Sequence, residues 1–532
     1  MKKMAAVAFM SLCAALSVQA AKKKAAAAPE APKPDMTVTF DPSMPTYKDL
    51  SKSRSFPDCG YAGCIADEGP EEFEEFFIRH PDETWETFKK AGAYVVKLWN
   101  ADGQWLANKE HAKIAYDWRK KHNVKTLLCL ENGGRSVDEA RSRILGFVRW
   151  ILDNGYANQV VGFELGNEPY WGEQPEKYAD RWAQIVPDIK ELWPEAQIGV
   201  PIAECWGVGS RDIEMVRKRM TSVDALFRTA GELGGIQKID QWTGRFIVAF
   251  SNCLHLCSHV VYHFYGGWGP YGCSCNGIAR IRATAVAFPE LAGKKVWITE
   301  WRIDSDQDLR SQQTFHLAMF DAMYMLMCVC QPEIECLSAH QCGQLSGGFY
   351  IANGRGIWKG QRRYGTGPDF FADADWTGHP RIEVGPVGPA FRLLNETAMA
   401  HPHVLARGRR KEGSIDDGRY GSSRAVAGSS CRSTLALEWV MYANPERTKI
   451  ALVVANAGLP EWRPTVKAVG CKLSRPRYQL YRCKPEFEMV SQYAGEPRLS
   501  WEESFEGKTE GELVIPGVTI ASVCYDVEKE GR

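Results

Sequence analysis

The sequence lacks the features that would point to nucleic acid, a membrane or a bound nucleotide. Its 532 residues carry 65 basic and 65 acidic side chains, so the formal net charge is zero and offers a polyanion no attraction. Beyond the N-terminal region no segment is apolar enough to span a bilayer. Gly133-Gly134 lacks the glycine spacing of a phosphate-binding turn. We therefore expect a soluble protein that binds neither nucleic acid nor a membrane.

The N-terminus has the pattern of a secretory signal peptide over residues 1–20. Two lysines precede the apolar run Ala5–Val18, which is too short to span a bilayer, and a small-x-small triplet predicts cleavage near Ala20. Residues 21–45 combine a tether rich in Lys, Ala and Pro with a candidate strand at Thr37–Phe40 that could pair with the C-terminal domain. The mature protein is expected to be secreted or periplasmic.

Residues 46–402 alternate short β-branched runs with longer amphipathic stretches. The predicted strands are Tyr94–Trp99, Val124–Leu130, Val160–Leu165, Gln197–Pro201, Val260–Phe264, Val296–Thr299 and Glu335–Ala339, with the first of eight placed near Gly60–Ala66. The predicted helices are Lys109–His122, Val137–Asn154, Pro175–Trp193, Asp224–Leu233 and Ser311–Cys330. Such alternation requires parallel strands with crossover helices, and eight units favour a (β/α)8 TIM barrel.

In residues 403–532 the alternation of predicted strands and helices stops. Strands split by Gly, Pro and Asn are predicted at Leu435–Tyr442, Lys449–Asn456, Tyr478–Cys483 and Glu512–Val527. No convincing helix accompanies them, so an antiparallel β-sandwich is expected after the barrel.

Of the 17 cysteines, Cys13 lies in the signal peptide, which leaves 16 for an exported chain that can keep disulfides. Plausible pairs are Cys59 with Cys64, and Cys471 with Cys483 or Cys524. A second group could suggest a metal site: Cys253, His255, Cys257, His259, Cys273 and Cys275. Its spacing is not that of a zinc ribbon, so disulfides or buried thiols are the expectation there.

Two glutamates follow strands that face each other across the predicted barrel mouth. Glu168 comes after the fourth strand and Glu300 after the seventh. Chemistry in such barrels lies where strands end, and glycoside cleavage needs two carboxyl groups flanking the bond. One must stay protonated and the other ionised, and we expect mutual repulsion to raise the pKa of the acid. The alternative is that each Glu caps a helix or forms a salt bridge.

The residues around these glutamates resemble those of a known group. Phe163–Pro169 resembles the acid/base motif of clan A retaining glycoside hydrolases, Val296–Trp301 their nucleophile strand, and His263-x-Tyr265 their sixth-strand element. The likeness is greatest to the α-L-arabinofuranosidase, β-xylosidase and heparanase-like branches. Val387–Leu394 is similar to the last barrel helix of the arabinofuranosidase branch.

The resemblance implies roles for individual residues. Glu168 would be the acid/base and Glu300 the nucleophile. Asn167 would hydrogen-bond the substrate's 2-hydroxyl, and Tyr265 would hold Glu300 in line. The remaining residues expected to bind substrate or line its pocket are His263, Trp301 and Lys97. Many members of the clan carry Arg where this chain has Lys97. A lysine ammonium is a compact charge, whereas the planar guanidinium of arginine can donate two parallel hydrogen bonds to one carboxylate.

The sequence thus predicts hydrolysis of a glycosidic bond in a carbohydrate substrate, with retention through a covalent glycosyl-enzyme. No cofactor or metal is expected, because carboxyl groups can perform both the proton transfer and the attack. Two alternatives remain: a barrel that only binds glycans after losing catalysis, and a metal- or thiol-dependent enzyme built on the Cys253–Cys275 group. The oligomeric state stays open.

Overall fold

A computed structural model describes the parts of the chain that position the site. These parts are residues 37–53, 62–66, 74–92, 94–130, 136–203, 238–265, 281, 284–285, 288–302, 315–339, 350–352, 382–384, 387–410, 437–457, 461–482, 501–506 and 513–529. The predicted signal peptide with its cleavage site near Ala20 and the predicted helix Asp224–Leu233 lie outside them. Within these ranges no helix is both long and apolar enough to cross a membrane.

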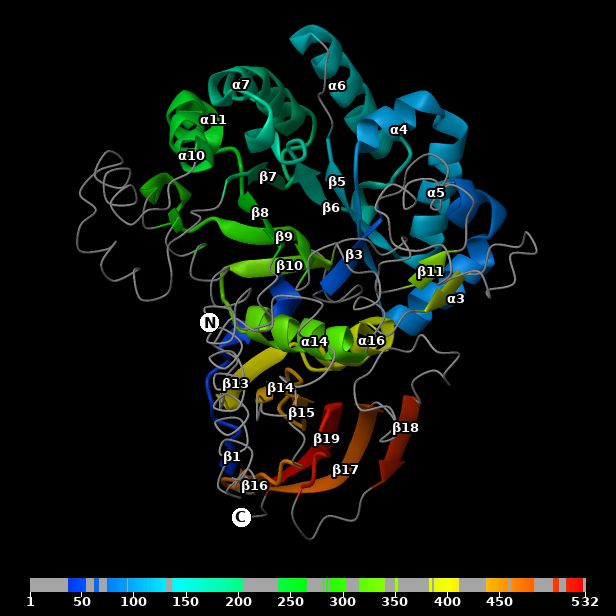
Figure 1. Cartoon of the computed structure of the whole chain (residues 1–532), viewed down its shortest axis with the longest axis vertical. Helices are drawn as coiled ribbons and strands as arrows, with labels where there is room; N and C mark the ends of the chain where they lie inside the picture. Colours follow the sequence, from blue (N-terminus) through cyan, green and yellow to red (C-terminus); the bar gives the residue numbers. More distant parts are fainter. Residues whose placement is uncertain are drawn as a thin grey trace, which may run out of the picture.

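Eight parallel strands form a closed barrel, which confirms the predicted fold class (Figure 1). The strands follow one another around the barrel in chain order, and the last closes it by pairing with the first. They are β3 (Ala62–Ala66), β4 (Val95–Leu98), β5 (Lys125–Cys129), β6 (Val160–Glu164), β7 (Ile198–Pro201), β8 (His259–Tyr265), β9 (Lys295–Arg302) and β10 (Ile334–Ala339).

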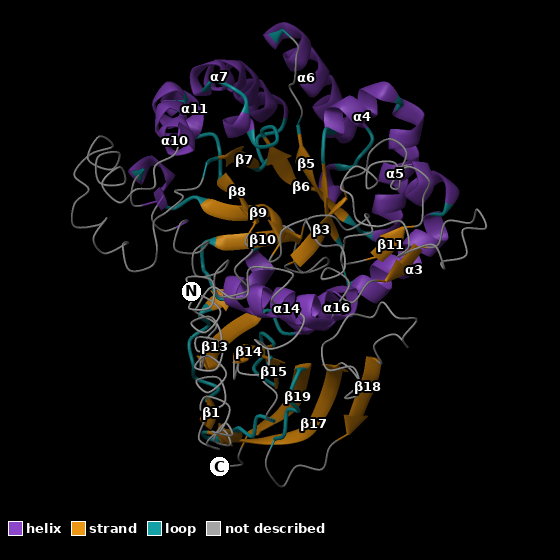
Figure 2. Ribbon diagram, in the orientation of Figure 1, coloured by secondary structure: helices purple, strands orange, loops and turns teal. Residues whose placement is uncertain are grey.

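Helices cover the outside of the barrel (Figure 2). The longer ones are α3 (Pro81–Ala91), α4 (Ala101–Ala107), α5 (Lys109–His122), α6 (Val137–Asp153), α7 (Pro175–Leu192), α10 (Lys238–Ala249), α14 (Phe315–Val329) and α16 (Val387–Ala400). Local sequence fixes several ends. Ser136 forms a capping box with Glu139 at the start of α6, and Asn108 accepts a hydrogen bond from the first turn of α5. Asn123, in the left-handed conformation, ends α5.

A small apolar cluster fills the barrel interior. Its largest side chain is Trp297 of β9, whose indole stacks on the His259 ring with 3.9 Å between centroids. Gly162 and Gly199, on β6 and β7, make room for the indole. A Cβ added to Gly162 would lie 2.3 Å from Trp297, and one added to Gly199 would lie 2.7 Å from it. The interior is therefore a packed core, as in other barrels of this size.

A β-bulge in β9 decides which side chains of this strand face inward. The register of β9 against β8 shifts by one residue at Thr299, which has no partner on β8. Strict alternation from the inward Trp297 would turn Glu300 out of the barrel. The extra residue reverses this order, so that Glu300 faces inward and Trp301 outward.

The C-terminal domain is the predicted β-sandwich, with one large and one small sheet. The large antiparallel sheet has the order β18 (Trp501–Glu506), β17 (Cys471–Arg482), β19 (Thr519–Lys529), β15 (Lys449–Asn456), β14 (Leu437–Ala443), β13 (His403–Arg410) and β2 (Lys48–Asp49). The small sheet pairs β1 (Thr37–Phe40) with β16 (Thr465–Ala468), so the N-terminal strand joins this domain. This pair is parallel, whereas the sequence predicted antiparallel strands throughout the sandwich. Helices α14 and α16 lie between the large sheet and the barrel (Figure 1).

The strand register corrects one predicted disulfide. Cys471 lies opposite Lys529 and Cys524 opposite Arg477 along the same pair of strands, so the two thiols do not face each other. The other pairings proposed from the sequence involve Cys59, Cys483 or the side chain of Cys64, which lie outside the described part of the structure.

Candidate active site

Four barrel strands bring charged side chains together at their C-terminal ends. The residues are Lys97 on β4, Glu164 on β6, His263 on β8 and Glu300 on β9. Strand alternation explains two of them. Val95 and Val261 belong to the interior cluster, and the side chain two residues later on each strand faces the same way. All four charged side chains are buried.

Glu168 and Asn167 reach the same place through a tight turn after β6. Gly166 has a φ of 81° and Glu168 a φ of 44°, both in the left-handed region. For a glutamate this conformation costs about 1–3 kcal/mol and persists only where the surroundings enforce it. The 3-10 helix η4 (Pro169–Trp171) follows at once, and its Trp171 N–H donates to the Glu168 carbonyl. The turn thus holds the Glu168 side chain over the barrel mouth.

The His263 ring contacts both predicted catalytic carboxylates. Its Nδ1 lies 3.0 Å from Oε1 of Glu168 and 3.3 Å from Oε2 of Glu300. Its Nε2 lies 2.9 Å from Oγ1 of Thr299, the bulge residue. One oxygen of each carboxylate and one ring nitrogen lie within 4.8 Å of one another. Glu300 is 9% exposed and Glu168 is 28% exposed, so the pair lies at the boundary between the core and solvent.

Lys97 supplies the second buried cation. Its Nζ donates to Oε1 of Glu300 at 3.0 Å and to Oδ1 of Asn167 at 2.9 Å, and it lies 3.3 Å from Oε1 of Glu164. The single ammonium therefore reaches three residues with its three hydrogens. Because Lys97 takes the amide oxygen of Asn167, the amide nitrogen of Asn167 remains as the donor that a sugar hydroxyl would need.

The electrostatics differ from the sequence expectation. Burial lowers the pKa of His263, but the charge of Glu300 and the hydrogen bonds to Glu164 and Glu168 outweigh burial and the repulsion from Lys97, raising this pKa to about 9. Burial and Glu300 both raise the pKa of Glu168. The hydrogen bond and the charge of His263 outweigh them, so the pKa of Glu168 is lowered instead.

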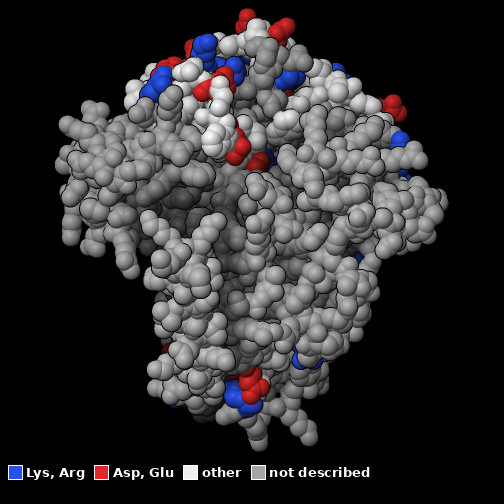
Figure 3. Space-filling view, in the orientation of Figure 1, with Lys and Arg blue, Asp and Glu red and all other residues white. Residues whose placement is uncertain are grey.

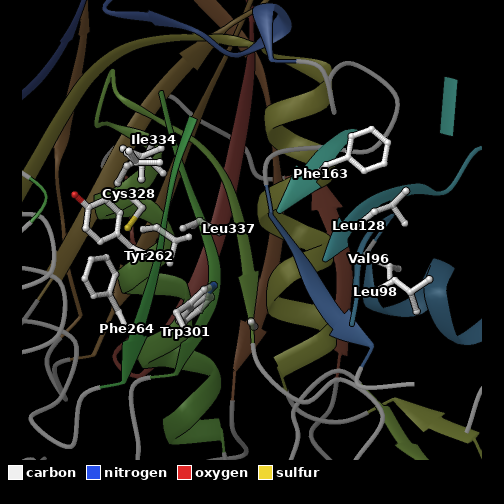
Figure 4. Close-up of a cluster of buried hydrophobic side chains, with 14 of the residues drawn as sticks. Val96, Leu98, Leu128, Phe163, Tyr262, Phe264, Trp301, Cys328, Ile334 and Leu337 are labelled. Carbon is white, nitrogen blue, oxygen red and sulfur yellow. The ribbon is translucent and has the colours of Figure 1, made fainter. Parts of the chain in front are cut away.

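Two residues expected from the sequence do not join the described cluster. The Trp301 indole is fully buried and packs on Tyr324 and Phe391, at 4.6 and 6.0 Å between ring centroids. Figure 4 shows it with the buried hydrophobic side chains of the strands. The expected substrate contact of Trp301 is therefore corrected: the bulge at Thr299 turns this side chain toward α14 and α16. Tyr265 ends β8, and its side chain lies outside the described part of the structure.

The structure also places residues in the site that the sequence reading did not select. Glu164 contacts both buried cations, and Tyr170 donates to Oε1 of Glu168 at 3.2 Å. The sequence could have indicated Glu164, because an ionisable residue at the end of an apolar strand needs a charged or hydrogen-bonding partner when it is buried. Nothing in the sequence predicted the bulge that brings Thr299 into the site.

The Cys253–Cys275 group does not form a metal site within the described residues. The Cys253 thiol faces the Ala183 carbonyl at 3.6 Å, Cys257 is buried, and His259 contacts Glu335 at 3.0 Å. Cys273 and Cys275 lie outside the described ranges. Among the described residues, the group whose ligand atoms lie close enough to share an ion is Glu168, His263 and Glu300.

Two exposed indoles lie near the barrel mouth. Trp171 is 59% exposed and Trp99, which directly follows β4, is 41% exposed. Exposed aromatic faces beside a polar site suit the apolar faces of sugar rings. On the face seen in Figure 3, the described acidic and basic side chains are intermixed.

A cavity of about 420 Å³ lies at the opposite end of the barrel. Its charged groups are occupied with one another or with the backbone. Lys295 lies 3.9 Å from Glu335, His403 lies 3.8 Å from Asp49, and the Lys48 ammonium donates to the Gln331 carbonyl. These contacts join the barrel to the C-terminal domain, so we assign this cavity a structural role.

The fold is shared with solved structures of glycoside hydrolases. Comparison with protein-family models and with curated sequences finds no match. Solved structures with the same fold include the family 51 α-L-arabinofuranosidase AbfB from Bifidobacterium longum (TM-score 0.60, 11% identity, 93% of this chain and 100% of that one). The α-L-arabinofuranosidase from Thermotoga maritima, solved with arabinose, has a TM-score of 0.58 at 12% identity, with 92% and 100% covered. BuGH86wt, solved with neoagarooctaose, has a TM-score of 0.52 at 10% identity, with 89% and 75% covered. The resemblance to clan A enzymes seen in the sequence is confirmed at the level of the fold.

Proposed function

We propose that this protein is an exported glycoside hydrolase that cleaves a glycosidic bond in an oligosaccharide or polysaccharide with retention. The observation that carries the proposal is the closeness of Glu168 and Glu300, whose nearest ligand oxygens lie within 4.8 Å. Retaining enzymes hold their carboxyl groups about 5–5.5 Å apart, whereas inverting enzymes need roughly 6.5–9.5 Å to admit a water. One oxygen of each carboxyl group lying within 4.8 Å of the other supports the shorter, retaining spacing.

In the first step Glu300 attacks the anomeric carbon while Glu168 gives its proton to the departing oxygen. The bond to the leaving group breaks as the bond to the Glu300 carboxylate forms. In the second step the Glu168 carboxylate takes a proton from water. The water oxygen attacks the anomeric carbon and releases Glu300.

The surrounding residues support this division of roles. Lys97 contacts Glu300 at 3.0 Å, so its ammonium favours the ionised form of Glu300, whereas His263 contacts both carboxylates and does not distinguish them. Lys97 donates to the amide oxygen of Asn167, and we infer that the amide nitrogen of Asn167 donates to the sugar, a contact that would strengthen as the transition state forms. Trp171 lies three residues after Glu168 and is 59% exposed, and we infer that its indole contacts the sugar on the leaving-group side.

The proposal is tested by the configuration of the first product. Purified protein is incubated with the 4-nitrophenyl glycosides of α-L-arabinofuranose, β-D-xylose and β-D-glucose and with neoagarooctaose. Proton NMR then follows the anomeric signals before mutarotation. Retention is expected. An inverted first product would overturn the mechanism, and failure to cleave a wider polysaccharide panel would favour the alternative of a glycan-binding barrel.

The predicted signal peptide supports export, and cleavage near Ala20 is checked by N-terminal sequencing of the protein recovered outside the cytoplasm. A mature chain that keeps residues 1–20 would contradict this part of the proposal.

A further inference from the structure

Glu164 is a third buried carboxylate beneath the catalytic pair. It is the last residue of β6, four residues before Glu168, and its side chain has no solvent exposure. Its Oε1 lies 3.3 Å from Nζ of Lys97 and 3.3 Å from Nε2 of His263. Its Oε2 is buried and has no hydrogen-bond partner among the described residues. One oxygen therefore serves two cations at once.

Each of these two cations also contacts at least one of the proposed catalytic carboxylates. Lys97 reaches Glu300 at 3.0 Å, and His263 reaches Glu168 at 3.0 Å and Glu300 at 3.3 Å. The described contacts of Glu164 stop at Lys97 and His263, so it would act on catalysis through them.

The charges of this cluster balance only when Glu164 is counted. Through both chemical steps one of the catalytic carboxyls carries a negative charge. The ionised group is Glu300 before attack and Glu168 in the glycosyl-enzyme. With Lys97 and His263 protonated and Glu164 ionised, the buried cluster is neutral in both states. Without Glu164 it would hold one excess positive charge, and an uncompensated buried charge is costly.

We propose that Glu164 is a positioning residue that keeps Lys97 and His263 charged and so sets the pH at which the catalytic pair works. This inference rests on the proposed function for its catalytic meaning, but its electrostatic content does not require a known substrate. The groups that face His263 are Lys97 on β4, Glu164 and Glu168 on and after β6, and Thr299 and Glu300 on β9. Two further groups lie one contact away, Cys129 beside Lys97 and Tyr170 beside Glu168. Glu164 and Glu300 both contact the two cations. Glu300 is assigned a bond-forming role, whereas Glu164 is assigned neither bond formation nor proton transfer.

The first test measures the titration of His263 directly. The protein is labelled with ¹⁵N-histidine, and the imidazole signals of its 11 histidines are followed with pH, with His263 assigned from the His263→Asn spectrum. In Glu164→Gln the pKa of His263 is expected to fall by about one pH unit or more, because a charged partner is lost. Glu164→Asp, which keeps the charge, should restore most of the difference. An unchanged His263 titration in Glu164→Gln would overturn the proposal, whether or not a substrate is known.

A matched control exists at the other end of the barrel. Glu335 on β10 accepts from Nε2 of His259 at 3.0 Å and does not touch the catalytic cluster. Glu335→Gln should shift the titration of His259 and leave that of His263 unchanged. A His263 shift of equal size in this variant would mean that general loosening of the fold, rather than the charge of Glu164, causes the effect. Thermal unfolding of each variant shows whether it is folded.

The second test is the pH profile of turnover. Removing one negative charge lowers the proton affinity of the whole cluster, so both limbs of the kcat/KM profile should move to lower pH in Glu164→Gln. A uniform loss of rate with an unmoved profile would indicate a merely structural role. If the wild type cleaves nothing, the proposed function fails, and the titration of His263 still decides the electrostatic role of Glu164.

Discussion

Replacing His263 by Asn should make the acid/base a weaker acid. The imidazolium Nδ1 lies 3.0 Å from Oε1 of Glu168, and its hydrogen bond and charge oppose the burial that would otherwise raise the Glu168 pKa. A nearby opposite charge lowers a carboxyl pKa by about 1–3 units. Because 28% of the Glu168 side chain meets solvent, we take the lower half of that range. The basic limb of the kcat/KM profile should therefore rise by about 1–2 pH units.

The direction in which the basic limb moves depends on which group loses its proton. In the proposed mechanism turnover needs Glu168 protonated, so the rate should fall as pH rises through the pKa of Glu168. In the wild type that pKa is low because His263, with a pKa of about 9, is still charged at the pH where Glu168 titrates. Asn keeps a hydrogen-bond donor but carries no charge. Without the charge Glu168 holds its proton to higher pH.

The assay should use an unactivated oligosaccharide, since a nitrophenol can leave without the proton. Tyr170→Phe provides a graded comparison, because Tyr170 donates a neutral hydrogen bond to Oε1 of Glu168 and also lowers its pKa. Its loss should move the basic limb in the same direction by a smaller amount. His259→Asn, at the other end of β8, should leave the limb in place. A basic limb that stays fixed or falls in His263→Asn would refute the reasoning.

Three further outcomes are expected. Glu168→Ala should slow hydrolysis of alkyl glycosides far more than that of nitrophenyl glycosides, and an equal loss on both would argue against the acid role. Glu300→Gly should abolish hydrolysis, and azide should restore partial turnover with a glycosyl azide of inverted configuration; rescue with retained configuration would contradict the nucleophile role. Trp171→Ala should raise KM for an oligosaccharide roughly fivefold, as the loss of about 1 kcal/mol of aromatic contact implies. KM for a nitrophenyl monosaccharide should change little, and a similar rise on both would remove the leaving-group assignment.

The barrel was predictable because its strands and helices alternate in the sequence, and the bounds of the predicted barrel elements that lie in the described ranges agree within a few residues. Helices α3, α4 and α10 were not predicted, and the predicted helix Asp224–Leu233 lies outside those ranges. Glu168 and Glu300 could be selected because they follow strands four and seven. The orientation of Glu300 and Trp301 could not be predicted, since it depends on one unpaired residue at Thr299. A bulge arises from the pairing of two strands, and neither strand alone shows it.

The charge network was also beyond the sequence. The substitution of Lys97 for the usual Arg was visible, but its consequence depends on Glu164, which comes from another strand 67 residues away. The expected rise in the Glu168 pKa considered only repulsion from Glu300. It omitted His263, because the 3.0 Å contact between their side chains exists only in the folded chain.

The packing of Trp297 against Gly162 and Gly199 closes the barrel below the charged cluster. Among the described residues, this packing leaves the mouth as the side on which the cluster meets solvent. Under the proposed function, a bound sugar would cover that side and so fix the number of protons shared by Glu168, His263 and Glu300. The proton given to the leaving group would then be replaced only after that group had departed and water had entered, so the barrel floor would help to set the order of the two proposed steps.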